Sequence, residues 1–169
     1  RRLDEVVIKT SDDAPHVFEQ LSTEALTKLT AEDLFSVLTE RGLWMLFREF
    51  PFMKIPTPKK EVPAIYISID NDEPFTPESS VVLAGKEDLL QLGVQVLSKL
   101  SKSVRVFASE SNEWAKTALK TPIQAFVNGA YPSNSAGVLL FHTKKDVSEN
   151  NAWSIQPQDL VLMMETLLT

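Results

Sequence analysis

The 169-residue sequence contains no cysteine, only two histidines, and five glycines that stand apart from one another. Without cysteine, the chain forms no disulfide and offers no thiolate to zinc or to an iron–sulfur cluster. His16 and His142 fit no metal-binding spacing such as H-E-x-x-H. Neither G-x-G-x-x-G nor G-x-x-x-x-G-K-[ST] occurs, so the glycine-rich loops that cradle a nucleotide phosphate are missing. Metal centres and ordinary dinucleotide binding are therefore not expected.

The charge balance and the hydrophobic runs argue against two further classes. The chain has 17 basic and 23 acidic residues and a net charge of −6, whereas a nucleic-acid-binding domain needs a basic surface. No apolar run approaches the roughly 18 residues that a membrane-spanning helix requires. No nucleic acid is therefore expected as a partner, and the length fits one domain that buries a full core.

Segments of strand and helix character alternate along the chain. Short runs rich in β-branched and aromatic residues predict strands over residues 3–9, 64–69, 104–108, 123–127 and 153–155. Helical signals extend from Ser22 to Phe50, with a helix expected after a Thr30 N-cap to about Arg41 and a helical turn or two from Leu43. Apolar residues at three- and four-residue spacing predict further helices over 86–101, 111–119 and 157–167. Residues 135–141 suit a helix or a strand. The alternation predicts an α/β fold, with a Rossmann-like, mostly parallel sheet and helices on both faces.

Three acidic residues, Asp70, Asp72 and Glu73, follow the predicted strand over 64–69. Ligands of open α/β sheets bind outside the carboxyl ends of the strands, so these side chains could form an acidic cluster in a binding crevice. The alternative is a polar turn in which an aspartate caps the next helix. We favour the polar turn and leave the binding role open.

Residues 42–56, GLWMLFREFPFMKIP, place six large apolar side chains within ten positions. Aromatic residues at helical spacing usually pack in a core. The prolines from Pro51 onward prevent a continuous helix, so these side chains cannot all face one core. Aromatic and methionine side chains on a loop suit a flat apolar ligand or a partner surface. A core role and an interface or ligand role both stay open for this stretch.

Four stretches cover most of the chain, namely LTAEDLFSVLTERGLWMLFREFPFMKIPTP, PAIYISIDNDEPFTP, GAYPSNSAGVLLFHT and NAWSIQPQDLVLMMETLLT. Together, in this order, they resemble the A subunit of the sodium-translocating NADH:quinone oxidoreductase (NQR) family. The third is similar to the family pattern G-x-[HY/F]-P-x-G-x-x-x-T-H-x-H-F. It departs from that pattern at Ser133–Ser135, where a second glycine is common, and at Val138–His142, where T-H-x-H-F is common. Any family contact made there would be altered in this chain.

The resemblance implies a division of the chain and a place in a larger assembly. Residues 1–10 resemble the exit strand of a truncated N-terminal biotinyl/lipoyl-like domain, and residues 16–169 resemble the family's central Rossmann-like α/β domain. The domain would be a soluble part of the quinone-linked subunit of a respiratory sodium pump, which couples NADH oxidation and quinone reduction to sodium translocation. The implied partners are quinone and the other subunits, especially a membrane subunit. The implied location is peripheral, on the cytoplasmic side of the bacterial inner membrane, and the isolated fragment is expected to be inactive.

The family's central domain is in turn similar to the flavin- and NADH-binding domain of the complex I flavoprotein subunit. That relative has a glycine-rich loop after its first helix, where this chain has RGLWMLF over residues 41–47. Bulky side chains there would fill the space that a phosphate and an isoalloxazine ring need. We therefore expect no cofactor in this domain. Flavins, iron–sulfur centres and NADH would be held by other subunits, with quinone as the substrate of the complex.

The family motif R-x-x-P-F-x-K-[VI]-P lies in the quinone-linked region and is matched here at Pro51, Phe52, Lys54 and Pro56. The resemblance implies that aromatic rings stack on the quinone and that the lysine hydrogen-bonds one of its oxygens. The alternative is a structural docking module of the complex that binds no ligand. No catalytic or metal-ligating residue is assigned. The candidate contacts to quinone or to another subunit are Trp44, Phe47, Phe50, Pro51, Phe52 and Lys54.

Overall fold

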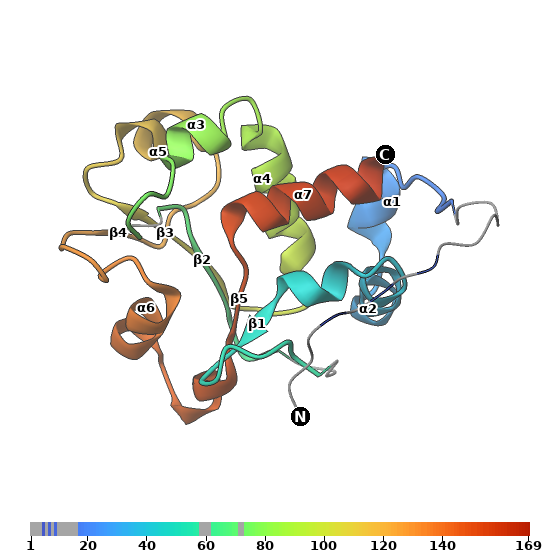
Figure 1. Cartoon of the computed structure of the whole chain (residues 1–169), viewed down its shortest axis with the longest axis horizontal. Coiled ribbons are helices and arrows are strands. Elements are labelled where there is room, and N and C mark those ends of the chain that lie inside the picture. Colours follow the sequence, from blue (N-terminus) through green and yellow to red (C-terminus); the bar gives the residue numbers. More distant parts are fainter. Residues whose placement is uncertain (1–4, 6, 8, 10–16, 58–61, 71–72) are drawn as a thin grey trace.

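A five-stranded sheet with the strand order β1-β5-β2-β3-β4 forms the centre of the computed structural model, which describes residues 5, 7, 9, 17–57, 62–70 and 73–169 (Figure 1). Strands β5, β2, β3 and β4 run parallel, and β1 is antiparallel to β5. The predicted α/β fold with a mostly parallel sheet is confirmed. The strands are β1 (Arg48–Glu49), β2 (Ile65–Ser68), β3 (Val104–Ser109), β4 (Ala125–Val127) and β5 (Trp153–Ser154).

The helices lie at the positions that the sequence predicts, with two additions, α3 and the short 3-10 helix η2. Helix α1 falls within the segment from Ser22 to Phe50 that carries helical signals. The predicted helix over 86–101 is shorter, and the ambiguous run at 135–141 is a helix. The strand predicted over 3–9 falls on residues of which only 5, 7 and 9 are described, so the division at residue 10 stays a prediction. The helices are α1 (Thr23–Lys28), α2 (Ala31–Glu40), η1 (Leu43–Leu46), α3 (Ser79–Val82), α4 (Glu87–Leu97), α5 (Glu113–Ala118), α6 (Ala136–Thr143), η2 (Val147–Asn151) and α7 (Pro157–Leu168).

Local side-chain chemistry explains where α2 begins and ends. The Thr30 hydroxyl accepts a hydrogen bond from the Asp33 N–H at 3.1 Å, and the Asp33 carboxylate accepts one from the Thr30 N–H, which completes a capping box. After α2, Gly42 adopts a left-handed conformation with φ +70°, a region that glycine enters at no steric cost. This turn redirects the chain into η1, as the interruption at Gly42 predicts.

The two faces of the sheet support two separate cores. Alternate residues of a strand point to opposite faces, so Ile65 and Ile67 join the larger core while Tyr66 joins the smaller one. In β3, Val106 and Phe107 divide in the same way. Helices α4 and α7 pack against each other over the larger core, and α6 packs on β2 over the smaller core (Figure 1). The smaller core is the one that borders the site described below.

A glycine allows α4 and α7 to pack closely on the larger core. A Cβ atom at Gly93 would lie 2.7 Å from Cδ1 and Cγ of Leu160, a fully buried side chain of α7. Contacts that short do not occur between real side chains, so the absence of a side chain at this position sets the distance between the helices. Among the described residues, no helix has both the length and the apolar character needed to cross a membrane.

The first turn of α7 carries a half-buried carboxylate. Pro157 occupies the first helical position, where a missing N–H costs nothing, and Asp159 lies two residues later. Burial raises the pKa of the Asp159 carboxyl above its ordinary value of 3.8, and the guanidinium of Arg48 on β1 opposes that rise. The charged form of Asp159 is therefore less favourable in the folded protein than in water.

Replacing Asp159 by asparagine is expected to change how the unfolding free energy depends on pH. Because the folded-state pKa is raised, the stability contributed by this group is complete below pH 3.8 and is lost as the pH rises through the folded-state pKa. Asparagine does not titrate, so the unfolding free energy of the variant minus that of the wild type should rise with pH over this range. Urea denaturation at a series of pH values measures this difference. A difference that falls with rising pH would contradict the raised pKa.

Candidate functional site

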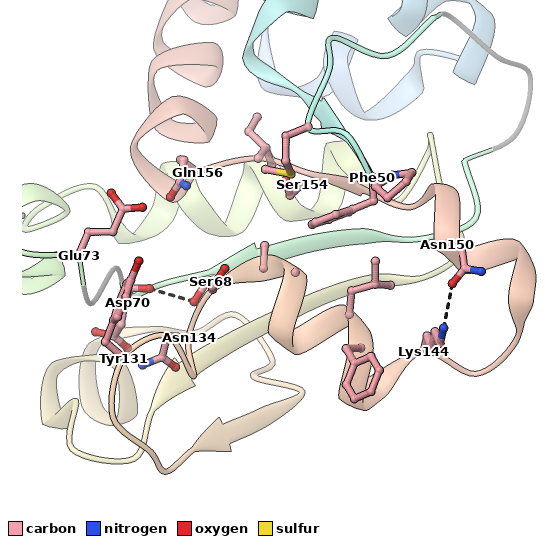
Figure 2. Close-up of a pocket in the computed structure, with 18 residues that line it drawn as sticks. Phe50, Ser68, Asp70, Glu73, Tyr131, Asn134, Lys144, Asn150, Ser154 and Gln156 are labelled. Atoms are coloured by element: carbon pink, nitrogen blue, oxygen red, sulfur yellow. Dashed lines mark hydrogen bonds between the residues drawn. The ribbon is translucent and has the colours of Figure 1, made fainter.

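A pocket of about 660 Å³ opens at the carboxyl ends of the neighbouring parallel strands β2 and β5 (Figure 2). Ser68 and Asp70 come from the end of β2, and Ser154 and Gln156 come from the end of β5. One face of α6 and the loop after β1 complete its walls. Open α/β sheets bind their ligands at this edge, and the volume lies within the range of about 300–1,000 Å³ typical of small-molecule sites.

The wall formed by the β1 loop and α6 is apolar. Phe50 is buried and belongs to the smaller core, whereas Phe141 on α6 is 72% exposed at the mouth. Leu140, also on α6, is a buried part of the lining. A Cβ atom built at Gly137 would lie 3.5 Å from Cε1 of Phe50, so the first turn of α6 runs directly beside this ring. The wall therefore presents aromatic and aliphatic surface on which a flat ring can lie.

Asp70 joins several elements at the polar end of the pocket. Its Oδ2 accepts a hydrogen bond from the Ser109 N–H at 2.5 Å. Its Oδ1 accepts one from the Asn112 amide at 2.6 Å and one from the Ser79 hydroxyl at 3.2 Å. The structural interpretation of this acidic segment therefore fits Asp70, which holds together the ends of β2 and β3 and the starts of α3 and α5. Asp72 lies outside the described residues, and Glu73 is an exposed side chain on the pocket wall.

The strand β5 contributes a buried hydroxyl to the pocket. Ser154 is 6% exposed, and its backbone pairs with Tyr66 on one side and Arg48 on the other. Its side chain points to the same face as Tyr66, toward the smaller core and the pocket, while Trp153 points into the larger core. No other described residue hydrogen-bonds the Ser154 hydroxyl. This hydroxyl therefore remains available to a bound molecule.

Beneath α6, a buried ionic cluster fixes the helix to the sheet. Arg105 on β3 pairs with Glu149 on η2 at 2.5 Å. The same guanidinium donates to the Tyr66 hydroxyl at 2.6 Å and to the Thr143 carbonyl, in the last turn of α6, at 2.8 Å. Burial raises the pKa of the Tyr66 phenol, so it stays neutral and can donate to Glu149, 3.3 Å away. The cluster thus sets where α6, and with it one wall of the pocket, lies.

Two of the sequence-predicted contact residues, Trp44 and Phe47, lie in the larger core. The Trp44 ring packs against Phe35, Phe47 and Trp153 at centroid distances of 5.0–5.5 Å, and its Nε1–H donates to the Pro56 carbonyl at 2.6 Å. Phe47 is fully buried. Neither side chain lines the pocket, so the core alternative that the sequence left open accounts for both.

The other predicted residues divide between the pocket wall and the surface. Phe50 and Pro51 line the pocket. Phe52 is 83% exposed and does not line it. Lys54 is also outside the lining and reaches Glu49, with Nζ 3.6 Å from Oε2. The structure thus brings together two of the six candidates, and contact with a ligand remains a prediction for them.

Sequence reasoning did not identify Gly137 and Ser154 as site residues. Each stands alone in a segment far from Phe50 in the sequence, and only the fold brings the three together. The polar edge has a partial signal in the sequence, because Asp70 directly follows the strand predicted over 64–69, and Ser154 lies within the strand predicted over 153–155. In the described part of the chain, no cluster of three or more histidine, aspartate or glutamate side chains is arranged to hold a metal ion.

Comparison with known proteins identifies the family to which the chain belongs. Residues 29–169 match the family model described as the NqrA second alpha/beta domain. Over the whole chain, the A subunit of the Na(+)-translocating NADH-quinone reductase is 25% identical in Vibrio campbellii and 28% identical in Vibrio vulnificus and Haemophilus influenzae. The chain spans about 38% of the length of these relatives. The chain therefore belongs to the NqrA second alpha/beta domain family, as the resemblance of its sequence predicts.

Proposed function

We propose that this domain is part of the quinone-linked A subunit of a sodium-translocating NADH:quinone reductase, and that its pocket receives the quinone ring. The observation that carries the proposal is the pocket itself, which combines an aromatic wall at Phe50 and Phe141 with polar groups at the ends of β2 and β5. A quinone has the matching chemistry, a flat apolar ring with carbonyl oxygens on its edge. The relatives are named as quinone reductases, which agrees with this choice of ligand.

The proposed assembly assigns electron input to other subunits. NADH, flavins and iron–sulfur centres would be held there, and this domain would lie peripherally on the cytoplasmic side of the membrane, against a membrane subunit. We also propose that the fold is Rossmann-like and related to the complex I flavoprotein domain without its nucleotide loop. In support of this, Leu43 and Trp44 follow Gly42 directly and are both buried in the larger core, which leaves little room there for a phosphate.

Replacing Phe141 by alanine is expected to weaken quinone binding with little effect on folding. The Phe141 ring lines the pocket and is 72% exposed. An aromatic contact contributes about 0.5–1.5 kcal/mol, so the dissociation constant should rise about 2- to 12-fold. Chemical-shift titration of the domain with a short-chain quinone measures this, and FMN and NADH serve as parallel ligands. Shifts in the pocket with FMN or NADH, but none with quinone, would refute the proposal.

Phe52 provides the matched control. It is a phenylalanine of similar exposure, 83%, and its neighbours Pro51 and Met53 line the pocket, but Phe52 itself does not. Replacing Phe52 by alanine should leave quinone affinity unchanged. If instead F141A and F52A weaken quinone binding equally, the ring contacts do not come from the pocket.

The docking module without a ligand is the second candidate function. It is favoured by the exposed apolar side chains at and near the pocket mouth, Phe52, Met53, Ile55, Tyr131 and Phe141. Such a surface suits a protein partner as well as a small molecule. On this alternative, F52A and F141A would both reduce incorporation of the A subunit into the complex, while the domain would show no saturable shift with quinone.

A further inference from the structure

We infer that the Ser154 hydroxyl and the first turn of α6 bind a carbonyl oxygen of a neutral ring that lies against Phe50. This inference rests on the proposed function and adds to it the orientation of the ligand. Figure 2 shows Ser154 and Phe50 close together at the pocket, with α6 beneath them. Four features of the site support it, namely the state of the hydroxyl, the start of α6, the gap at Gly137 and the charge of the lining.

The Ser154 hydroxyl makes no hydrogen bond within the described part of the chain, and it borders the pocket. Its residue is 6% exposed, and its oxygen faces the pocket rather than the larger core. A hydroxyl that borders a pocket bonds water when the pocket is empty, and a ligand acceptor can take over that hydrogen bond. A free hydroxyl at the polar edge of the pocket, opposite the apolar wall of Phe50 and α6, fits a donor to a ligand acceptor.

The start of α6 adds backbone donors beside this hydroxyl. The helix has eight residues, and the side chain of its N-cap residue, Ser135, makes no capping hydrogen bond. The first N–H groups of a helix have no partner within it and carry partial positive charge. Ser135, Ala136 and Gly137 all line the pocket. The neighbouring start of α7 offers less, because Pro157 has no N–H.

Gly137 leaves the edge of the Phe50 ring that faces the first turn of α6 uncovered. A Cβ atom at this position would be in van der Waals contact with Cε1 of Phe50, at 3.5 Å, and would cover the adjoining surface. The contact is not a clash, so alanine can be accommodated at Gly137 by the fold. Alanine is also a better helix former than glycine. The glycine is thus not required by the backbone here, and its missing side chain leaves more of the Phe50 ring exposed to a ligand in the pocket.

The charge of the pocket selects a neutral acceptor over an anion. Asp70 and Glu73 both line it, whereas Lys144 is the one basic side chain of the described lining and donates to Asn150 at 2.9 Å. A phosphate or carboxylate would be repelled by the two acidic side chains. A carbonyl oxygen accepts the same hydrogen bonds without a formal charge, which matches a quinone and not a nucleotide.

The test is the affinity of wild type and Ser154→Ala for two probes, 2-methyl-1,4-naphthoquinone and 2-methylnaphthalene, which share a ring system but differ in the two carbonyl groups. We expect S154A to bind the quinone about 2- to 12-fold more weakly, which corresponds to the net contribution of one hydrogen bond, and to bind the hydrocarbon with unchanged affinity. The carbonyl stretch of the bound quinone, measured by infrared difference spectroscopy, should lie at lower frequency in the wild type than in S154A.

The control variant is Gly137→Ala, which should fold as stably as the wild type and bind both probes more weakly, because its methyl group fills the gap beside Phe50. If S154A binds the quinone as the wild type does, or loses both probes equally, the orientation inferred here is wrong while the proposed function stands. If the wild type binds neither probe, both are wrong. If it binds the hydrocarbon as tightly as the quinone, the pocket makes no carbonyl hydrogen bond and the inference fails.

Discussion

Replacing Arg105 by methionine is expected to lower the free energy of unfolding by about 3–5 kcal/mol, the usual cost of removing one partner from a buried ion pair. The variant keeps a side chain of similar length but leaves the Glu149 carboxylate buried without its partner. It also removes the donor to Tyr66 and to the Thr143 carbonyl that fixes the end of α6. Urea denaturation at pH 7, followed by circular dichroism, measures the loss.

An exposed ion pair provides the control for this prediction. Lys120 and Asp88 are 3.1 Å apart, but their side chains are 68% and 85% exposed. Replacing Lys120 by methionine should change the unfolding free energy by no more than about 0.5 kcal/mol. The double variant R105M/E149L should recover much of the loss, because an apolar pair needs no charge compensation. A loss below about 1 kcal/mol in R105M would mean that water reaches Glu149 and that α6 is held by its apolar contacts.

The sequence predicts the fold best where one kind of periodicity extends over a whole element. Helices α2, α4 and α7 have apolar residues at helical spacing, and two of them have recognisable first residues, Thr30 and Pro157. Strands β2 and β3 are short apolar runs that are buried on both faces of a parallel sheet. In these elements the secondary-structure propensity of the residues and their burial in the fold favour the same structure.

The prediction fails where long-range pairing decides the structure. Arg48 and Glu49 lie in a stretch that the apolar spacing predicts as helical, yet they form β1 by pairing with β5, about a hundred residues away in the sequence. The run at 135–141 is ambiguous in sequence because α6 is apolar on more than one side. Leu139 and Leu140 pack toward the sheet, and Phe141 forms the pocket mouth. No local pattern separates such a helix from a buried strand.

The candidate site is predicted in part, for a similar reason. The unusual density of aromatic residues points to the segment that contains Phe50 and Pro51, both of which line the pocket, and ligand contact by them stays a prediction. That density does not show which rings face the core, because this depends on the turn at Gly42 and on the position of β5. No sequence pattern marks Ser154 or Gly137 as a site residue. Each becomes a candidate only because the fold brings it to the same pocket as the Phe50 ring.

Replacing Trp44 by alanine is expected to lower the unfolding free energy by about 3–5 kcal/mol, as large-to-small changes of buried aromatic residues usually do. The ring contacts Phe35, Phe47 and Trp153, so its loss leaves a cavity in the larger core. It also leaves the Pro56 carbonyl without the hydrogen bond from Nε1. Chemical denaturation of W44A measures the effect, and Met45→Ala, at the neighbouring position that is 59% exposed, is the control expected to have little effect.

The conservative variant Trp44→Phe separates a core role from a ligand role for this residue. Phenylalanine keeps most of the buried apolar surface but cannot donate to Pro56, so a smaller loss of stability, about 1–2 kcal/mol, is expected. Because Trp44 does not line the pocket, W44F should bind a short-chain quinone with wild-type affinity. Weaker quinone binding by W44F at unchanged stability would indicate that Trp44 contacts the ligand, which is one of the two roles that the aromatic pattern leaves open. Unchanged affinity with reduced stability would assign Trp44 to the larger core alone.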